Sequence, residues 1–398
     1  MIDKKLAKKI DDYAKKIKDE AISIRRELHQ IPEIGEDLPK TRRFILNELN
    51  KYDVEVSENV GNNGIVALLK GGQEGKTVAY RADMDALPIL EGNDFQFKSK
   101  HKGKMHACGH DGHVTIALSI LKVLSFIKDE IKGNIKFVFQ PAEETVGGAL
   151  NMINDGVLQN PKVEYILGSH IWPSIESGQF GLRKGPIMAG ADIFEIFIQG
   201  KGGHGAMPHK AINPIVVGCK IINEIEAIKN YFVNSNENAV VTIGALNSGD
   251  VHNVIPHNAT ILGTVRFFSK DTQDIIIEKL QKIIDNISDI YGAECTLKYT
   301  KRFPATINNS DVISNIEHIL TSYGMEGNIF KIDEPSMGAE DFSFYLQEIP
   351  GSFIFLGTKN EEKEIVNEIH HPRFNIDEDI FEKATSILCK LLLEFLEK

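Results

Sequence analysis

Short apolar runs alternate with stretches of helical periodicity through the N-terminal part of the chain. Four runs have the length of a strand and are apolar at nearly every position: 65–69, 77–80, 135–139 and 163–167. Such runs are typical of strands that are buried on both faces of a sheet. Apolar residues at helical spacing occupy 39–49, 114–127 and 149–155. Strands that alternate with helices in this way predict an α/β domain with a mostly parallel sheet.

The pattern changes after Gly185 and Pro186. Residues 192–199 alternate between apolar and polar, as a half-buried strand does. The elements expected next are a helix at 213–230, strands at 240–246 and 260–267, a helix at 272–290 and a strand at 294–299. This order of strand, helix, two strands, helix and strand is that of a ferredoxin-like α+β sandwich. We therefore expect an inserted ferredoxin-like domain at 187–301.

The α/β pattern resumes from Phe303 and Pro304, with a strand at 352–356 and a last helix at 378–397. A charged, helix-periodic stretch at 3–30 begins the chain. The first domain is therefore expected to be discontinuous, formed by 1–186 and 302–398, with the insertion as a second compact domain.

Reactive side chains follow the predicted strands where those strands end, or lie in the loop before the helix at 114–127. In chain order they are Asp85, Cys108, His110, Glu143, Glu144 and His170. The carboxyl ends of the strands in an open α/β sheet are where the active site lies. Thiolate and imidazole are strong ligands for zinc and similar ions. These residues therefore predict a metal site at one edge of the sheet.

The cysteine stretch has two other interpretations. An isolated Cys-x-His pair is more often a buried cysteine beside polar loop histidines than a metal site. A structural zinc site would need a second Cys/His pair, and Cys219, Cys295 and Cys389 each stand alone. Because acidic and imidazole groups also converge from several strand ends, metal ligation is favoured over both.

Composition narrows the class of protein. The chain has 398 residues, 42% hydrophobic and 25% charged, which suits two domains with a sizeable core. Its net charge of −11, without a basic stripe, argues against nucleic acid as a partner. No apolar run is long enough to span a membrane, and residues 1–20 lack the apolar segment of a signal peptide. With four unpatterned cysteines, we expect a cytoplasmic protein without membrane attachment.

Seven segments, in this order, carry a resemblance to a known family. They are Arg26-Glu27-Leu28-His29 with Pro32-Glu33, the stretch 81–88, the stretch 105–113, Gln140-Pro141-Ala142-Glu143-Glu144, His170, Gly202-Gly203-His204 and His370-x-Pro372-x-Phe374. The chain resembles, over nearly its whole length, the binuclear metal amidohydrolases and peptidases. That family includes hippurate hydrolase, indole-3-acetyl-amino-acid hydrolase and N-acetyl-diaminopimelate deacetylase. Any one motif would be a weak signal, whereas the ordered set is a strong one.

The resemblance implies a centre of two divalent ions, which could be zinc, manganese, cobalt or nickel. Its implied ligands are Cys108, His110, Glu144, His170 and His370. Cys108 would bridge the ions, so that a thiolate and a carboxylate partly neutralise them. His371 is the alternative to His370, which is favoured because the family ligand lies two residues before the proline.

Neighbouring residues receive supporting roles or none. Related peptidases have a histidine where this chain has Asp83, so Asp83 is given no ligand role, and Asp85 matches the carboxylate that supports the site. His106 and His113 flank the ligands and are expected to pack or to hold them in place.

The resemblance also implies roles in catalysis. Glu143 would be the general base that takes a proton from water between the ions and passes it to the leaving amine. His204 would donate to the oxyanion, with the inserted domain acting as a lid and dimerisation domain. In some relatives this histidine comes from the partner subunit, so a homodimer or homotetramer is possible. Asn253 and Arg266 fall where the family holds its substrate, and Arg266 could bind a carboxylate.

The function expected first is a metal-dependent amidase that cleaves N-acyl-L-amino acids, like hippurate hydrolase, aminoacylases or carboxypeptidases. The motifs do not separate it from N-acetyl-L,L-diaminopimelate deacetylase of lysine biosynthesis. A third hypothesis is a binding module that has lost turnover. Loss of Glu143 or of a ligand would indicate that module, and all of them are present.

Overall fold

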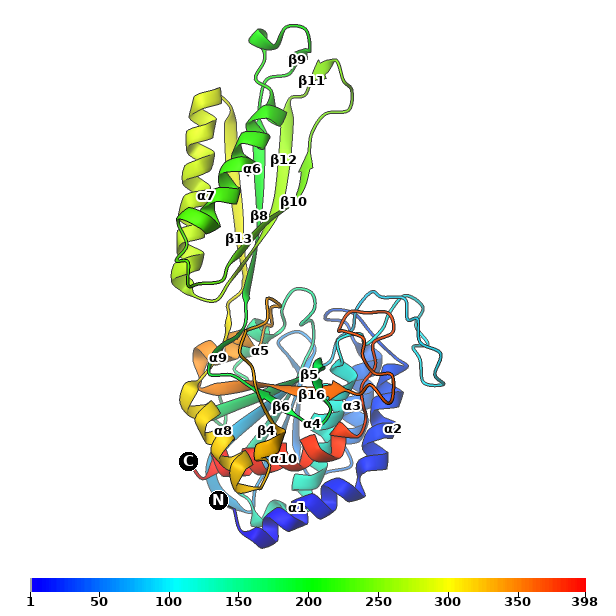
Figure 1. Ribbon diagram of the computed structural model, residues 1–398. Coiled ribbons are helices and arrows are strands. Elements are labelled where there is room, and N and C mark those ends of the chain that lie inside the picture. Colours follow the sequence, from blue (N-terminus) through cyan, green and yellow to red (C-terminus); the bar gives the residue numbers. More distant parts are fainter. Residues whose placement is uncertain (1) are drawn as a thin grey trace. The chain divides into compact units, whose positions relative to one another are not determined.

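The computed structural model describes residues 2–398 (Figure 1), and the chain divides into two compact units. The first unit contains the chain up to Ile187, then Ile307–Glu334 and Asp341–Lys398. The second unit contains Met188–Thr306 and the short segment Pro335–Glu340. The pattern of the sequence had placed the insertion at 187–301, without that short segment.

The first unit is built on a sheet of eight strands. In spatial order they are β1 (Glu55–Val60), β2 (Gly64–Lys70), β4 (Lys132–Gln140), β3 (Gln73–Asp83), β5 (Val163–Glu176), β16 (Gly351–Lys359), β6 (Phe180–Leu182) and β15 (Ile329–Lys331). The central strands β4, β3, β5 and β16 are parallel to one another. The pairs β1–β2, β2–β4 and β6–β16 are antiparallel. The predicted mostly parallel α/β sheet is confirmed.

Helices complete the first unit and cover its sheet. They are α1 (Lys4–Lys16), α2 (Lys18–His29), α3 (Pro39–Leu49), α4 (His110–Ser125), α5 (Ala149–Asn154), α8 (Ser310–Ser322), α9 (Ser343–Glu348) and α10 (Ile380–Leu396). Nearly every residue of α4 and α10 is buried, which is why both stretches are apolar on all sides. Their side chains join those of β3 and β16 in one hydrophobic core.

Several expected boundaries in the first unit were wrong. The helix expected at 3–30 breaks at Ile17 into α1 and α2. The helix expected to begin at Val114 begins at His110, because Gly109 takes a left-handed backbone (φ 88°) and turns the chain straight into it. The strand expected to end at Leu167 continues to Glu176, so His170 lies within a strand and not after one.

The second unit is a four-stranded antiparallel sheet with two helices. In chain order its elements are β8 (Gly190–Gln199), α6 (Pro214–Tyr231), β10 (Val240–Asn247), β12 (Asn258–Phe267), α7 (Lys270–Tyr291) and β13 (Glu294–Phe303). The strand order β10-β12-β8-β13 places the first and last strands side by side. Figure 1 shows α6 and α7 on one face, and their apolar side chains form a second core with that face. The predicted ferredoxin-like α+β order is confirmed.

Short elements complete the chain. A two-stranded ribbon of β9 (Gly203–His204) and β11 (Val254–Ile255) belongs to the second unit, and β7 (Gly185–Met188) and β14 (Thr306–Asn308) lie where the chain passes between the units. Within residues 2–398, no helix combines the length and the apolar character needed to cross a bilayer.

Candidate metal centre

Cys108 and His110 are positioned by the start of α4. Both are buried, and Gly109 between them lies against the strand that carries His170, since a Cβ atom on it would come 3.3 Å from Cβ of Ile171. Space and backbone conformation therefore both favour glycine between the two residues. The thiol and the first imidazole of α4 are held at the edge of the sheet as a result.

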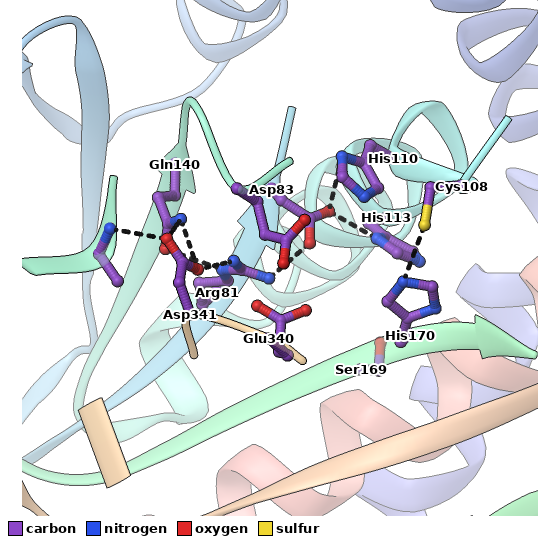
Figure 2. Close-up of polar contacts among 12 residues, drawn as sticks. Arg81, Asp83, Cys108, His110, His113, Gln140, Ser169, His170, Glu340 and Asp341 are labelled. Atoms are coloured by element: carbon purple, nitrogen blue, oxygen red, sulfur yellow. Dashed lines mark hydrogen bonds and ion pairs between the residues drawn. The ribbon is translucent and has the colours of Figure 1, made fainter. Parts of the chain in front are cut away.

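A first group of possible ligands consists of Cys108, His110 and His170, whose ligand atoms lie within 4.8 Å of one another. The Cys108 Sγ and the His170 Nε2 are 3.4 Å apart, and Figure 2 shows the two side chains facing each other. His170 Nδ1 donates to the carbonyl of Ile171 at 2.7 Å. This bond leaves the lone pair of Nε2 facing the sulfur, which is the form of histidine that binds a metal.

A second group consists of Cys108, Glu144 and His370, again with ligand atoms within 4.8 Å. His370 Nε2 lies 3.4 Å from Glu144 Oε1. The amide of His370 donates to the carbonyl of Ala107 at 2.7 Å, which ties this loop beside the cysteine. His371 is in neither group, and its Nδ1 accepts from the amide of Arg373.

The two groups share one atom, the sulfur of Cys108. His110 lies between them, with Nδ1 3.4 Å from Asp85 Oδ1 and Nε2 3.8 Å from Glu144 Oε1. Both ring nitrogens of His110 and the Glu144 Oε1 are buried and have no hydrogen-bond partner among the described residues. Buried polar atoms without partners are costly. Bound cations would use the lone pair of one His110 nitrogen and that of Glu144 Oε1, and the other His110 nitrogen would keep its proton, so these residues fit a two-metal centre.

The electrostatics of the site also favour cations. Burial lowers the pKa of His110, but the carboxylates of Asp83, Asp85 and Glu144 outweigh it and raise that pKa to about 10. Burial, together with Glu144 and Glu143, raises the pKa of the Cys108 thiol well above its usual range. In the protein alone, protons therefore balance an excess of negative charge, and divalent ions would replace them.

Asp85 holds the two consecutive glutamates. Its carboxylate accepts from the amide of Glu143 at 3.1 Å and from the amide of Glu144 at 3.2 Å. The Glu143 carboxylate is buried and forms a further group with His110 and Glu144. The structure thus brings Asp85, Glu143 and all five predicted ligands into the first unit's site.

Asp83 and His113 are more closely involved than the sequence indicated. His113 Nδ1 donates to Asp83 Oδ1 at 2.6 Å, and its Nε2 accepts from the amide of Ile171 at 2.9 Å. Burial lowers the pKa of His113, consistent with this neutral form. Asp83 also accepts from Arg81. The signal in the sequence that could have indicated a role for Asp83 was the spacing of Arg81, Asp83 and Asp85, since alternate residues of a strand share a face.

The remaining predicted residues lie in the second unit. His204 is exposed on β9 and pairs across the ribbon with Val254, next to Asn253. Arg266 on β12 is half-buried, and its Nη1 donates to Thr264 Oγ1 and to the carbonyl of Val265. Roles for these three residues stay predictions.

Comparison with known proteins identifies the family. Residues 79–394 match the model of peptidase family M20/M25/M40. Thermostable carboxypeptidase 1 of Saccharolobus solfataricus is 40% identical over 99% of this chain and all of its own length. Hippurate hydrolase of Campylobacter jejuni is 34% identical over 94% of this chain and 96% of its own length.

A solved structure supports the same relationship. It is a dinuclear metal-binding peptidase of the M20 family from Bacillus subtilis, 33% identical, with a TM-score of 0.84 over 96% of this chain and 99% of that one. At the level of the family, the expected hydrolase of amide or peptide bonds is confirmed. The fold, the ordered motifs and these relatives agree, and the chain belongs to peptidase family M20/M25/M40, the metal amidohydrolases and peptidases that its sequence resembles.

Proposed function

We propose that this protein hydrolyses the amide bond between an acyl group and an L-amino acid with a free carboxylate. The observation that carries the proposal is the sulfur of Cys108, which belongs to two groups of ligand atoms at once. Hippurate hydrolase and carboxypeptidase, the names of two relatives, both describe enzymes that release a C-terminal amino acid from such an amide.

The same proposal assigns two divalent ions to the site, chosen from zinc, manganese, cobalt and nickel. The ligands would be Cys108, His110, Glu144, His170 and His370. When bound, the ions would lower the pKa of a water between them and polarise the substrate carbonyl. Among these ligands, the Cys108 thiolate and the Glu144 carboxylate supply two negative charges to the centre.

Proton transfer is assigned to Glu143. Its amide is held by Asp85, and its carboxylate lies beside His110 and Glu144 without being needed as a ligand. It would take a proton from the attacking water and deliver it to the leaving nitrogen as the carbon–nitrogen bond breaks. The products are a carboxylic acid and an amino acid.

The second unit supports the proposal of a homodimer or homotetramer. Arg266 pairs with Ala191 at one end of β8, whereas His204 follows Gln199 at the other end. Eight residues of strand span about 27 Å, which is longer than an N-acyl amino acid. If Arg266 holds the substrate carboxylate and His204 the oxyanion, the two must come from different copies of the chain.

Subunit complementation tests this sharing. Glu143→Gln and His204→Ala are each expected to be nearly inactive, and a refolded mixture should regain up to about a quarter of wild-type turnover, because half of the dimers are mixed and one of their two sites is intact. A mixture as inactive as its components would contradict the shared site.

A substrate panel tests the function itself. We expect hydrolysis of hippurate and other N-acyl-L-amino acids by metal-loaded protein, and none of the D-isomers. Faster cleavage of N-acetyl-L,L-diaminopimelate would replace the proposal with that deacetylase. Binding without turnover of any member would indicate the non-catalytic module. The 40% identity to a carboxypeptidase makes dipeptides a necessary part of the panel. We also propose the cytoplasm as its compartment, because its four cysteines are free.

A further inference from the structure

We propose that Asp341 is a positioning residue that holds both ends of the loop carrying Glu143 and Glu144. This inference rests on the proposed function only for the roles of the two glutamates. The loop, 141–148, runs from the end of β4 at Gln140 to the start of α5 at Ala149. Asp341 is fully buried in the first unit and lies 192 residues further along the chain than Ala149.

Both carboxylate oxygens of Asp341 accept hydrogen bonds from the ends of this loop. Gln140 Nε2 donates to Oδ1 at 2.8 Å and to Oδ2 at 2.7 Å, which fixes the start of the loop. The amide of Ala149 donates to Oδ2 at 3.0 Å, which fixes its end. One carboxylate therefore holds both ends of the eight-residue loop, and the positions of Glu143 and Glu144 depend on it. We call the contacts of Asp341 with Gln140 and Ala149 the clasp.

Arg81 connects this clasp to the metal ligands. Its Nη2 donates to Asp341 Oδ1 at 2.7 Å and its Nε donates to Gln140 Oε1 at 3.0 Å. The same guanidinium donates to Asp83, whose other oxygen accepts from His113 and lies 3.7 Å from His110 Nδ1. Figure 2 shows this row of side chains from Gln140 and Asp341 to His110. The loop is thus held in a fixed position relative to the proposed ligand at the start of α4.

Charge explains why a carboxylate is needed at position 341. Arg81 is almost fully buried and lies between the carboxylates of Asp83 and Asp341. Four donor contacts converge on Asp341, from Arg81, from Gln140 twice and from Ala149. An asparagine of the same shape has one acceptor oxygen and would turn an N–H against a donor. Asp341→Asn should therefore release the loop without changing volume.

The first experiment measures the clasp without turnover. In Asp341→Asn we expect amide hydrogens of 142–149 to exchange on the order of tenfold faster. We expect weaker metal binding in a chelator competition, because Glu144 moves with the loop. With saturating metal, kcat should fall about 10–100-fold with little change in KM, since a small displacement of a catalytic group has that effect.

A matched control lies in the second unit. Asp192 is also fully buried, and it accepts from the Gln273 side chain, the Tyr299 hydroxyl and the amide of Arg302. Asp192→Asn should lower thermal stability while leaving exchange at 142–149 and metal affinity at wild-type values. If Asp341→Asn gives only that pattern, Asp341 is an ordinary buried carboxylate and the inference is overturned.

A double-mutant cycle sharpens the assignment. Gln140→Glu alone places a second carboxylate against that of Asp341. Gln140→Glu combined with Asp341→Asn restores a pair of one carboxylate and one amide. The double variant should lose at least about fivefold less kcat than the product of the single losses. Exchange should recover near Gln140 and stay fast at Ala149, which still lacks its acceptor. Additive losses would overturn the inference. If exchange and metal affinity respond as expected but no substrate is cleaved, the clasp stands and the proposed function fails.

Discussion

The two units of this protein bury charge very differently. The first unit buries Arg25, His29, Arg81, Asp83, Asp111 and most of the candidate metal ligands, whereas in the described part of the second unit the buried charged side chains are Asp192 and Glu340. The second unit is stabilised mainly by an apolar core between its sheet and its two helices. The first has such a core as well, but adds a layer of buried charge that includes the pairs of Arg25 and His29 with Asp111 and of Arg81 with Asp341.

This difference indicates where the chemistry lies. Burying a charge is expensive unless it is paired, so a compact set of buried charges is kept where positions must be exact for function. Changes to the metal, protons or buried charges of the first unit should therefore leave the folding of the second unit almost untouched.

Metal removal should have the largest effect. Treatment with a chelator should abolish hydrolysis, and added divalent ions should restore it, because the proposed ligands come from a prefolded sheet. Calorimetry should show the transition of the first unit moving to lower temperature, since ions bind the folded state only, with the second unit's transition in place. Full activity in protein shown by elemental analysis to be metal-free would contradict this.

The next largest effects should come from the two adjacent glutamates, and they should differ in kind. Glu143→Gln should keep its metals and lose about 10²–10⁴-fold in kcat, because it removes the proposed general base. Glu144→Gln should lose metal affinity itself, because it removes a proposed ligand. Metal stoichiometry measured beside kinetics distinguishes them. A metal-depleted Glu143→Gln with a metal-replete, inactive Glu144→Gln would reverse the two roles.

Breaking the buried charge layer should destabilise the first unit. Asp111 accepts from Arg25 Nε at 2.9 Å and from His29 Nδ1 at 2.7 Å, and all three side chains are buried. Asp111→Asn leaves both cations without this charge and should cost about 3–5 kcal/mol in urea unfolding. The control is Glu278→Gln on the exposed face of α7, where the pair with Lys282 should contribute nothing measurable. Equal losses of unfolding free energy in Asp111→Asn and Glu278→Gln would refute the comparison between the two units.

The smallest expected effect is a pH dependence. Burial lowers the pKa of His29, but Asp111 and then Glu91 outweigh it and raise that pKa above 6.5. The folded protein therefore keeps this proton to higher pH than the unfolded chain, so the stabilisation is present below pH 6.5 and is lost as pH rises through the raised pKa. The unfolding free energy of His29→Gln should lack this decline above pH 6.5. Parallel curves for both proteins would show that His29 does not carry it.

Much of the fold could be predicted because burial leaves a local pattern. The central strands β3 and β4 are covered on both faces and read as apolar runs, and the alternation in β8 reveals a sheet with one covered face. Strand β1 was missed because it is an edge strand with mostly exposed, polar residues. The end of β5 was missed because Gly168, Ser169 and His170 are polar or small yet still pair with β16.

The candidate site was predictable for a different reason. Motifs name the residues, and their places beside the parallel strands indicated one edge of the sheet, so Cys108, Glu144 and His170 could be assigned to one site before any coordinates. The supporting contacts could not. Arg81 and Asp341 are 260 residues apart, and nothing local in the sequence says that their charges meet. The alternation of Arg81, Asp83 and Asp85 hinted at one face but not at its partners.

The division of the chain has a consequence for domain exchange. The second unit is not one contiguous insertion, because Pro335–Glu340 belongs to it as well and contributes carbonyls of Ser336 and Gly338 to the amide of Ala189. A chimaera that replaces only 188–306 with the equivalent region of a relative would keep Pro335–Glu340 of the original chain. The grafted unit would then contain a strip of six residues that does not come from the relative. That strip ends at Glu340, one peptide bond before Asp341. Graft junctions must therefore be chosen in four places, and the last of them adjoins the residue that fastens the 141–148 loop.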